Sequence, residues 1–277
     1  MTGWVEVSDG VLQRRYEPYD VTVAVVRGAD GLLVVDTRGS RRQGDELRDD
    51  LRVLGRPVRY VVNTHGHFDH CFGNQCFGPA LPIYGHERLP AQLADHEAPK
   101  LARTLASGVE GSAEFQDVVL TPPTRLVGGE EWLDLGDRAV DLLYLGRGHT
   151  DNDLILHVDG SWIVGDLVEE SGPPAYGKDS FPLEWPDTLA ALLPRLRAGH
   201  AVIPGHGAPV DADFVRRQHD DVAAVADLIA ELHGAGVPED RTIAEGGARW
   251  PFPPEGLDDA VRRGYAQIHG GGVGTCG

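Results

Sequence analysis

Side chains that bind metal ions are concentrated in one short segment of the chain. His65, His67, Asp69 and His70 fall within six consecutive positions, after an apolar run at residues 58–63. Imidazole and carboxylate groups are the ligands that zinc and related divalent metals accept in proteins. In an extended segment His65 and His67 point to the same side of the backbone and can bind one ion together. Asp69 and His70 lie on the next turn of the backbone, where they can face a second ion.

Three further segments share one pattern, an apolar run followed by a ligand-type residue that a glycine directly precedes. The ligand-type residues are His149, Asp166 and His206. Residues at strand ends lie on a rigid scaffold and converge on one edge of a sheet. One such residue alone would be typical of a turn, but together with the first segment they predict a shared metal site. Gly66, between the first two histidines, is expected to let the backbone pass close to the metal ions.

The other histidines lack this context, and we interpret them as surface or supporting residues: His86, His96, His157, His200, His219, His233 and His269. The cysteines are Cys71, Cys76 and Cys276, an odd number that gives no disulfide framework. Four residues separate the first two, not the two residues of a redox pair. We interpret each cysteine as a small, semi-buried apolar residue.

Strands and helices that could position these side chains follow from the apolar pattern. Continuous apolar runs predict strands buried on both faces at residues 21–26, 32–36 and 58–63. Further strands are expected at residues 83–84, 154–158, 161–164 and 201–204, and hairpins around residues 136–137 and 159–160. Helical spacing predicts helices over residues 41–54, 89–105, 187–197 and 213–233. Pro99 and Pro194 should interrupt two of them, and Asp187 should cap the third.

The composition is that of an ordinary globular protein. With 277 residues, 41% of them hydrophobic and 25% charged, the chain is expected to form one large α/β domain. The formal net charge of -18 argues against nucleic acid and anionic membranes as partners, and we interpret the surface acids as keeping the protein soluble. The expected partner is a small-molecule substrate. The N-terminus has no cationic start or apolar run of a secretory signal, and no stretch approaches the ~20 apolar residues of a membrane span. We therefore expect a soluble, cytoplasmic protein, and the oligomeric state stays open.

Residues 64–70, Thr-His-Gly-His-Phe-Asp-His, resemble the His-x-His-x-Asp-His signature of the metallo-β-lactamase superfamily. Asp36 is similar to the Asp of the superfamily's first motif, which supports the metal loop, and His149, Asp166 and His206 match the later motifs in order. The surrounding sequence is similar to stand-alone metallohydrolases of the sulfur-oxidation-associated and quinoprotein-relay-associated group. The resemblance covers residues 5–233. It implies an α/β (α+β) fold, a four-layer αββα sandwich of two mixed β-sheets flanked by helices.

The resemblance also implies how the ligands divide between two ions. His65, His67 and His149 would bind the first, Asp69, His70 and His206 the second, and Asp166 would bridge them. One or two zinc ions per chain are expected, with iron and manganese as alternatives.

The chain departs from three branches of the superfamily. Asp166 stands where some lactamases carry Cys, which argues against antibiotic hydrolysis. The superfamily's quorum-signal lactonases carry a Tyr soon after this position, whereas the nearest here is Tyr176. The interval between His149 and His206 is too short for the insert of family nucleases.

These features predict a hydrolase in which a hydroxide activated by one or two zinc ions attacks an ester, thioester, lactone or amide carbonyl. Asp69 is the candidate catalytic residue, expected to orient the hydroxide and handle its proton. Asp36 and Thr150 are candidates to orient the imidazoles. The loop at residues 169–186 is expected either to be an ordinary surface loop or to form part of the substrate wall through Tyr176, Lys178, Phe181 and Trp185.

Two other functions stay open. A mononuclear iron oxidoreductase of the persulfide dioxygenase type would hold one iron with His65, His149 and Asp166. A non-catalytic metal-binding protein would keep the site without turnover. In each case residues 1–240 are predicted to be the catalytic or metal-binding domain. Residues 241–277 are predicted to be a C-terminal extension with a mobile, Gly-rich tail that starts at Gly270.

Overall fold

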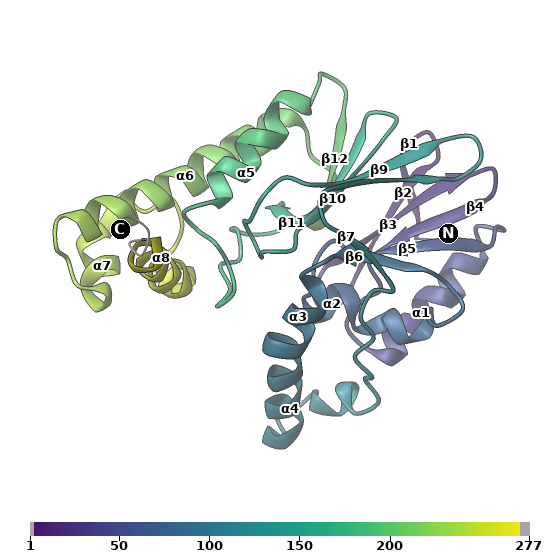
Figure 1. Cartoon of the computed structure of the whole chain (residues 1–277), viewed down its shortest axis with the longest axis horizontal. Helices are drawn as coiled ribbons and strands as arrows, with labels where there is room; N and C mark the ends of the chain where they lie inside the picture. Colours follow the sequence, from purple (N-terminus) through teal and green to yellow (C-terminus); the bar gives the residue numbers. More distant parts are fainter. Residues whose placement is uncertain (1–2, 272–277) are drawn as a thin grey trace, which may run out of the picture.

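Apolar runs in the first half of the chain form a mixed sheet. The computed structural model describes residues 3–271 and is drawn in Figure 1. The first sheet contains β1 (Val5–Ser8), β2 (Val11–Tyr16), β3 (Val21–Gly28), β4 (Gly31–Val35), β5 (Val58–Val62), β6 (Ile83–His86) and β7 (Arg125–Val127). Strands β4 to β7 pair in parallel, and β1 to β4 pair antiparallel. The burial of β4 along its whole length and of β3 along nearly all of it confirms the prediction for these two runs. The third run was predicted to be buried on both faces, but β5 is buried only at Val61 and Val62, and Arg59 is exposed.

The second sheet is built from the middle of the chain. It contains β8 (Glu130–Asp134), β9 (Ala139–Tyr144), β10 (Leu154–Val158), β11 (Ser161–Glu169) and β12 (Ala201–His206). β11 and β12 are parallel, and the other pairs are antiparallel. The predicted hairpins join β8 to β9 and β10 to β11. A bridge between Val21 of β3 and His206 of β12 links the two sheets. The predicted ligand His206 therefore lies where the two sheets meet.

Three apolar clusters arrange the sheets and helices in four layers. The middle cluster contains Val26 and Leu33 of the first sheet together with Leu142 and Leu156 of the second, so these faces pack on each other. The outer face of the first sheet packs on α1 (Arg41–Arg52), and that of the second on α5 (Trp185–Leu192) and α6 (Ala212–Gly234). Figure 1 shows α1 on one side of the strands and α5 and α6 on the other. The predicted αββα sandwich is therefore confirmed.

Helices next to the site are short and irregular. α2 (Phe68–Cys71) continues into a 3-10 turn (Phe72–Cys76), and α3 (Leu89–Gln92) is followed by a π-helical turn (Leu93–Glu97) and α4 (Ala98–Ser107). The helix predicted over residues 89–105 is therefore interrupted by the π turn, and Pro99 lies in the first turn of α4. A 3-10 turn (Ser112–Phe115) completes this side of the molecule.

Of the other predicted helices, only the one expected over residues 187–197 needs a correction, at its start. α5 begins at Trp185 with Glu184 in the capping position, so Asp187 lies inside the helix and does not cap it. A 3-10 turn (Leu193–Arg195) follows α5, in agreement with the interruption expected at Pro194. α1 and α6 match their predictions closely, and the carboxylate of Asp211 caps α6.

Two helices after residue 238 were not predicted. α7 (Glu239–Gly246) and α8 (Asp258–Gly271) are joined by 3-10 turns (Gly247–Arg249 and Pro254–Gly256), and Trp250, Leu257 and Tyr265 enter the same apolar cluster as α6. Gly270 and Gly271 are helical, although the mobile tail was predicted to start at Gly270. The remaining tail residues, with Cys276, lie outside the described residues. The domain boundary at residue 240 stays a prediction. No helix within residues 3–271 has the length and apolar character needed to cross a membrane.

Candidate metal centre

The ligand-type residues identified in the sequence meet at one edge of the two sheets. His65 and His67 follow β5, and α2 carries Asp69 and His70. His149 lies between β9 and β10, and His206 is the last residue of β12. Asp166 lies inside β11, which continues to Glu169 and not only to residue 164 as predicted. The four chain segments thus converge as the strand-end pattern predicts.

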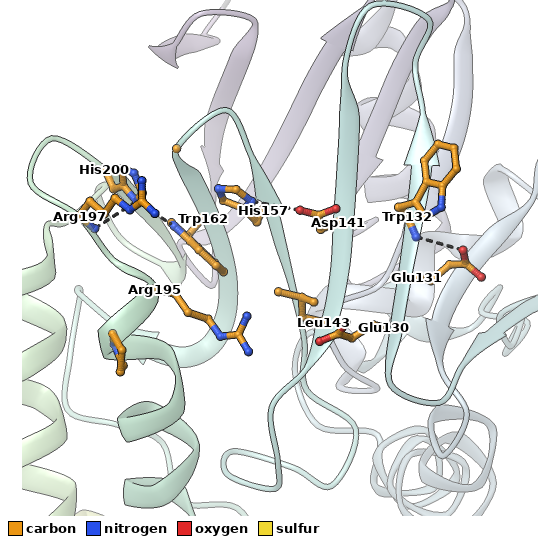
Figure 2. A pocket seen from close by; sticks show the side chains of 12 residues that line it. Glu130, Glu131, Trp132, Asp141, Leu143, His157, Trp162, Arg195, Arg197 and His200 are labelled. Atoms are coloured by element: carbon orange, nitrogen blue, oxygen red, sulfur yellow. Dashed lines mark hydrogen bonds and ion pairs between the residues drawn. The ribbon is translucent and has the colours of Figure 1, made fainter.

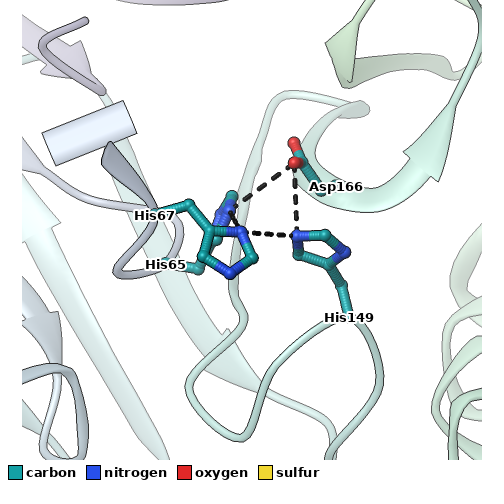
Figure 3. A group of neighbouring side chains, drawn as sticks. All are labelled: His65, His67, His149 and Asp166. Carbon is teal, nitrogen blue, oxygen red and sulfur yellow. Dashed lines mark hydrogen bonds and ion pairs between the residues drawn. The ribbon is translucent and has the colours of Figure 1, made fainter. Parts of the chain in front are cut away.

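Four side chains form the first group of potential ligands (Figure 3). Nδ1 of His67 lies 3.1 Å from Nε2 of His65 and 2.8 Å from Nε2 of His149. Oδ2 of Asp166 lies 3.5 Å from Nε2 of His65 and 3.3 Å from Nε2 of His149. Donor atoms around a tetrahedral zinc ion are roughly 3.3 Å apart. The spacing within this group therefore fits one ion.

A second group lies beside the first and shares Asp166 with it. Nε2 of His206 lies 3.3 Å from Nε2 of His70 and 3.4 Å from Oδ2 of Asp69. Oδ1 of Asp166 lies 3.2 Å from Nε2 of His70, and its Oδ2 lies 3.6 Å from Nε2 of His206. The Asp166 carboxylate therefore lies between the two groups.

Two glycines leave space for the closely packed side chains at the two groups. A Cβ atom at Gly205 would collide with Oδ1 of Asp166, so only glycine fits beside the shared carboxylate. Gly66 is needed for a reason other than the predicted one. A Cβ atom there would lie 2.5 Å from Cγ of Gln92, so the space beside Gly66 is taken by Gln92.

Each of the five imidazoles has one nitrogen bound to an oxygen outside the cluster. The outer partners are Thr64 Oγ1 for His65 (3.0 Å), Asp179 Oδ2 for His67 (2.9 Å), Asp36 Oδ2 for His70 (2.8 Å), the Ala175 carbonyl for His149 (3.1 Å) and the Tyr19 carbonyl for His206 (2.8 Å). A neutral imidazole that donates its outer N–H has a lone pair on the inner nitrogen. Such lone pairs repel one another at these distances unless a cation lies between them. Oδ1 of Asp166 is buried and forms no hydrogen bond of good geometry, although Nε2 of His70 lies 3.2 Å from it. The donor set therefore fits divalent metal ions.

Asp36 organises the loop that carries the first ligands, as the sequence resemblance implies. Its Oδ1 accepts from the Thr64 backbone N–H at 2.8 Å, and its Oδ2 accepts from the Thr64 hydroxyl at 2.8 Å and from His70 Nδ1. The Thr64 hydroxyl in turn is the outer partner of His65. Thr150 was predicted to orient an imidazole, but its hydroxyl instead donates to Asp153 at 2.6 Å and accepts from the Asn152 backbone N–H, and so fixes the turn after His149.

Two acidic residues near the centre were not identified from the sequence. Asp179 accepts from His67 and from the side-chain amide of Gln92, which locks the His67 ring in place. Glu169 is 6% exposed and could form a third potential ligand group with Asp166 and His206. Asp179 lies in the loop predicted as substrate wall, and Glu169 is the first residue of that range, but neither has a motif of its own.

Burial lowers the pKa values of the imidazoles in the cluster, whereas the neighbouring carboxylates raise them. Burial lowers the pKa of His149 to about 4, so its imidazole is neutral at pH 7. Burial also lowers the pKa of His206, but Asp166 outweighs this effect and raises that pKa to about 9. The same opposition raises the pKa of His70, which faces Asp166, Asp69 and Asp36. Without metal, protons therefore balance part of the negative charge of the cluster.

Metal uptake is expected to release protons. A raised pKa means that His206 carries a proton at pH 7.5, and a metal ion binds only the unprotonated nitrogen. Zinc binding to metal-free protein should therefore release about one proton or more per chain, and the apparent affinity should rise with pH up to about 9. Calorimetry in buffers of different ionisation enthalpy measures this release. A binding enthalpy that does not depend on the buffer would contradict it.

A cavity of about 700 Å³ opens above the two groups, and we name it the metal cavity. Its wall includes Tyr176 and Lys178, as predicted, and also His96, Glu97 and Lys100, which were not predicted. The other two predicted wall residues do not line it. Trp185 is fully buried against the His149 ring, and the Phe181 ring lies between the guanidinium groups of Arg147 and Arg263.

A second cavity, of about 830 Å³, lies on the outer face of β8 to β11 (Figure 2). Trp132, His157 and Trp162 line it, and His157 pairs with Asp141 at 3.2 Å. None of the seven predicted ligands lines this cavity. A metal ion held by these ligands would therefore act on a substrate in the metal cavity and not in the second cavity.

The remaining histidines and the two described cysteines belong to none of the groups of potential ligands. His86 is buried and its ring lies 4.1 Å from that of Tyr144. His233 and His269 face each other, with 3.2 Å between their Nε2 atoms. Cys71 is buried and Cys76 is partly buried, and both are free thiols.

Comparison with protein families gives a match over residues 16–207, to the model described as the metallo-beta-lactamase superfamily. A metallo-beta-lactamase type 2 of Bacillus sp. (strain 170) is 26% identical over 188 residues, which are 66% of this chain and 65% of that protein. This chain thus spans just under two thirds of the length of the Bacillus protein. A hydroxyacylglutathione hydrolase of Anaeromyxobacter dehalogenans (strain 2CP-C) is 26% identical over 245 residues, 87% of this chain and 84% of that protein.

Two solved structures have a similar fold at low sequence identity. A metallo-beta-lactamase from Pontibacter korlensis matches with a TM-score of 0.63 and 18% identity, over 79% of this chain and 97% of that chain. The DIM-1 metallo-beta-lactamase matches with a TM-score of 0.64 and 20% identity, over 80% and 97%. The four-layer architecture is therefore shared with these proteins.

Proposed function

Because the chain belongs to the metallo-beta-lactamase superfamily, we propose that it is a metal-dependent hydrolase acting on a small molecule. The observation that carries the proposal is the convergence of seven donor side chains from four segments, with their inner atoms facing one another around Asp166. The match over 87% of this chain to a relative named as a hydrolase supports the same class of reaction.

Each ligand group would hold one ion. His65, His67 and His149 would bind the first, and Asp69, His70 and His206 the second, with Asp166 as the shared ligand. We propose zinc for both positions, because imidazole nitrogen and carboxylate oxygen suit it. A bound divalent ion would make hydroxide available near neutral pH and polarise a carbonyl group.

The protein side chains orient the reactants and move protons. Asp69 lines the metal cavity and its Oδ2 lies 3.4 Å from Nε2 of His206, within the second group. From this position it would orient an attacking water and accept its proton. The outer partners of the imidazoles hold each ring in a single tautomer, so the inner donors stay fixed. The polar cluster lies at the floor of a cavity that can enclose a substrate of drug size.

The substrate class is a carbonyl compound that water can cleave. Thioesters are the first candidate substrates, because the alignment with the hydroxyacylglutathione hydrolase covers 87% of this chain. Esters, lactones and amides are the next candidates, since the same attack on a carbonyl cleaves each of them.

Metal analysis combined with a substrate screen tests the proposal. The purified chain should contain one or two zinc ions, and zinc-loaded protein should hydrolyse at least one thioester, ester, lactone or amide. Protein stripped with a chelator should be inactive and should recover on adding zinc. Iron at about one per chain together with oxygen uptake would instead identify an oxidoreductase. Stoichiometric metal without any turnover would identify a metal-binding protein.

A further inference from the structure

An apolar side pocket adjoins the metal cavity. Its volume is about 210 Å³, and its walls are formed mainly by Tyr19, Phe68, Phe72, Leu101, Thr104 and Phe115. The Phe68 ring meets those of Tyr19, Phe72 and Phe115 edge to face, at centroid distances of 5.0 to 6.1 Å. These contacts give the side pocket firm aromatic walls.

Three residues line both the side pocket and the metal cavity: Phe68, Glu97 and Lys100. Phe68 lies in the segment of residues 64–70, next to the potential ligand Asp69. A substrate whose reacting bond lies at the metal ligands can therefore extend into the side pocket.

Glu97 is a buried carboxylate at this junction. It is 2% exposed, and its Oε2 has no hydrogen-bond partner among the described residues. It ends the π-helical turn that interrupts the helix predicted there, and such turns are frequent at functional sites. A buried acceptor without a donor costs free energy, which a bound donor would recover.

Lys100 limits what kind of donor Glu97 can accept. Its Nζ lies 3.5 Å from Oε1 of Glu97 and 5.0 Å from the centre of the Phe68 ring. The charge of Glu97 is therefore already balanced on one side, and a second cation would be repelled by the ammonium group. A neutral hydroxyl or amide N–H matches the free Oε2 better.

The size of the side pocket sets the size of the apolar group. An apolar cavity of roughly 150 Å³ in another protein takes up benzene. A pocket of about 210 Å³ therefore accommodates a phenyl ring with one or two further carbons, or an alkyl group of that size.

We infer that the substrate carries an apolar group of phenyl size, which enters the side pocket, and a neutral hydrogen-bond donor, which binds Glu97. The inference rests on the proposed hydrolase function for the reacting bond, but the subsite itself can be tested by binding. Glu97 would then determine specificity without taking part in bond cleavage.

Kinetics with two thioesters of ethanethiol test the side pocket. Zinc-loaded protein should favour the phenylacetyl over the acetyl thioester by about tenfold or more in kcat/KM, because the ring is buried. Thr104→Phe should fill the pocket and remove this preference. Ala102→Phe adds the same ring at an exposed position of α4 and should keep it. If both variants kept the same preference for the phenylacetyl thioester and still hydrolysed the acetyl thioester, the role of the side pocket would be refuted. The proposed hydrolase function would not be affected.

Binding of two probes tests Glu97 independently of hydrolysis. Benzyl alcohol should bind the zinc-loaded full chain about tenfold more tightly than benzyl methyl ether, which lacks the donor. Glu97→Leu should abolish this difference, and Thr104→Phe should weaken both probes. Equal affinities in the wild type would overturn the role of Glu97. Discrimination between the probes without hydrolysis of any thioester, ester, lactone or amide would support the subsite and refute the hydrolase.

Discussion

Replacing His67 by alanine is expected to abolish hydrolysis and to remove most of the bound metal while the fold persists. Nδ1 of His67 lies closest to the other donors of the first group, 2.8 Å from Nε2 of His149. The loss of this donor leaves the ion with too few ligands, and several kcal/mol of transition-state stabilisation depend on the ion. We expect kcat/KM to fall by at least about 1000-fold.

The fold should survive because His67 lies at the wall of the metal cavity and its side chain is 14% exposed. Metal content, turnover and thermal unfolding would be measured together. His219→Ala is the matched control, since His219 lies on α6 and pairs with Asp220, away from the cluster. Full turnover in His67→Ala would rule out the assigned metal centre.

The candidate metal ligands could be located from the sequence because their signal is local. Three histidines and an aspartate within six positions form a pattern that ordinary turns rarely have. His149, Asp166 and His206 each follow an apolar run, and parallel or adjacent strands bring such ends to one edge. The pattern predicted convergence, but only the resemblance implied the order of the layers.

The outer partners of the imidazoles could not be predicted in the same way. Asp179 lies 112 residues from His67 in an irregular loop, and it is one of 43 acidic residues. The partners of His149 and His206 are the backbone carbonyls of Ala175 and Tyr19, which have no side-chain signature. Such contacts depend on the tertiary path of the loop, which local sequence does not determine.

The residues that line the metal cavity could likewise be predicted only in part. Residues of a loop can point toward a site or away from it, and apolar type alone does not decide which. Tyr176 lines the metal cavity, whereas Trp185 turns into the core behind His149. Glu97 and Lys100 were missed because they lie in a segment with ordinary helical spacing.

The C-terminal helices were missed for a different reason. Gly and Pro residues are frequent after residue 238, and this composition argues against regular structure. Tertiary packing overrides it, since Trp250, Leu257 and Tyr265 are buried in the apolar cluster around α6. A helix of low intrinsic propensity can be stable when it buries an apolar face.

Asp36→Asn is expected to weaken the second metal site by about 10- to 100-fold while the protein stays folded. Asp36 has a left-handed backbone, with φ at +67°, which asparagine tolerates well. The carbonyl oxygen of the new amide should keep accepting from the Thr64 backbone N–H, which leaves its NH2 group facing His70 Nδ1. That nitrogen must then act as acceptor, so the proton moves to Nε2 of His70. A protonated Nε2 cannot bind the ion that it faces together with His206 and Asp69.

Zinc titration and nitrogen-15 NMR of the His70 ring would measure the affinity and the tautomer in the same variant. The first group should lose less affinity than the second, because His67 and His149 keep their outer partners Asp179 and Ala175. Only His65 of this group depends on Asp36, through the Thr64 hydroxyl. Asp141→Asn is the matched control, since Asp141 also pairs with an imidazole, that of His157, on the outer face of the second sheet. If both variants bound two ions with wild-type affinity, Asp36 would have no part in presenting Nε2 of His70. A loss of second-site affinity with the tautomer unchanged would show that the carboxylate acts through its charge and not through the proton position.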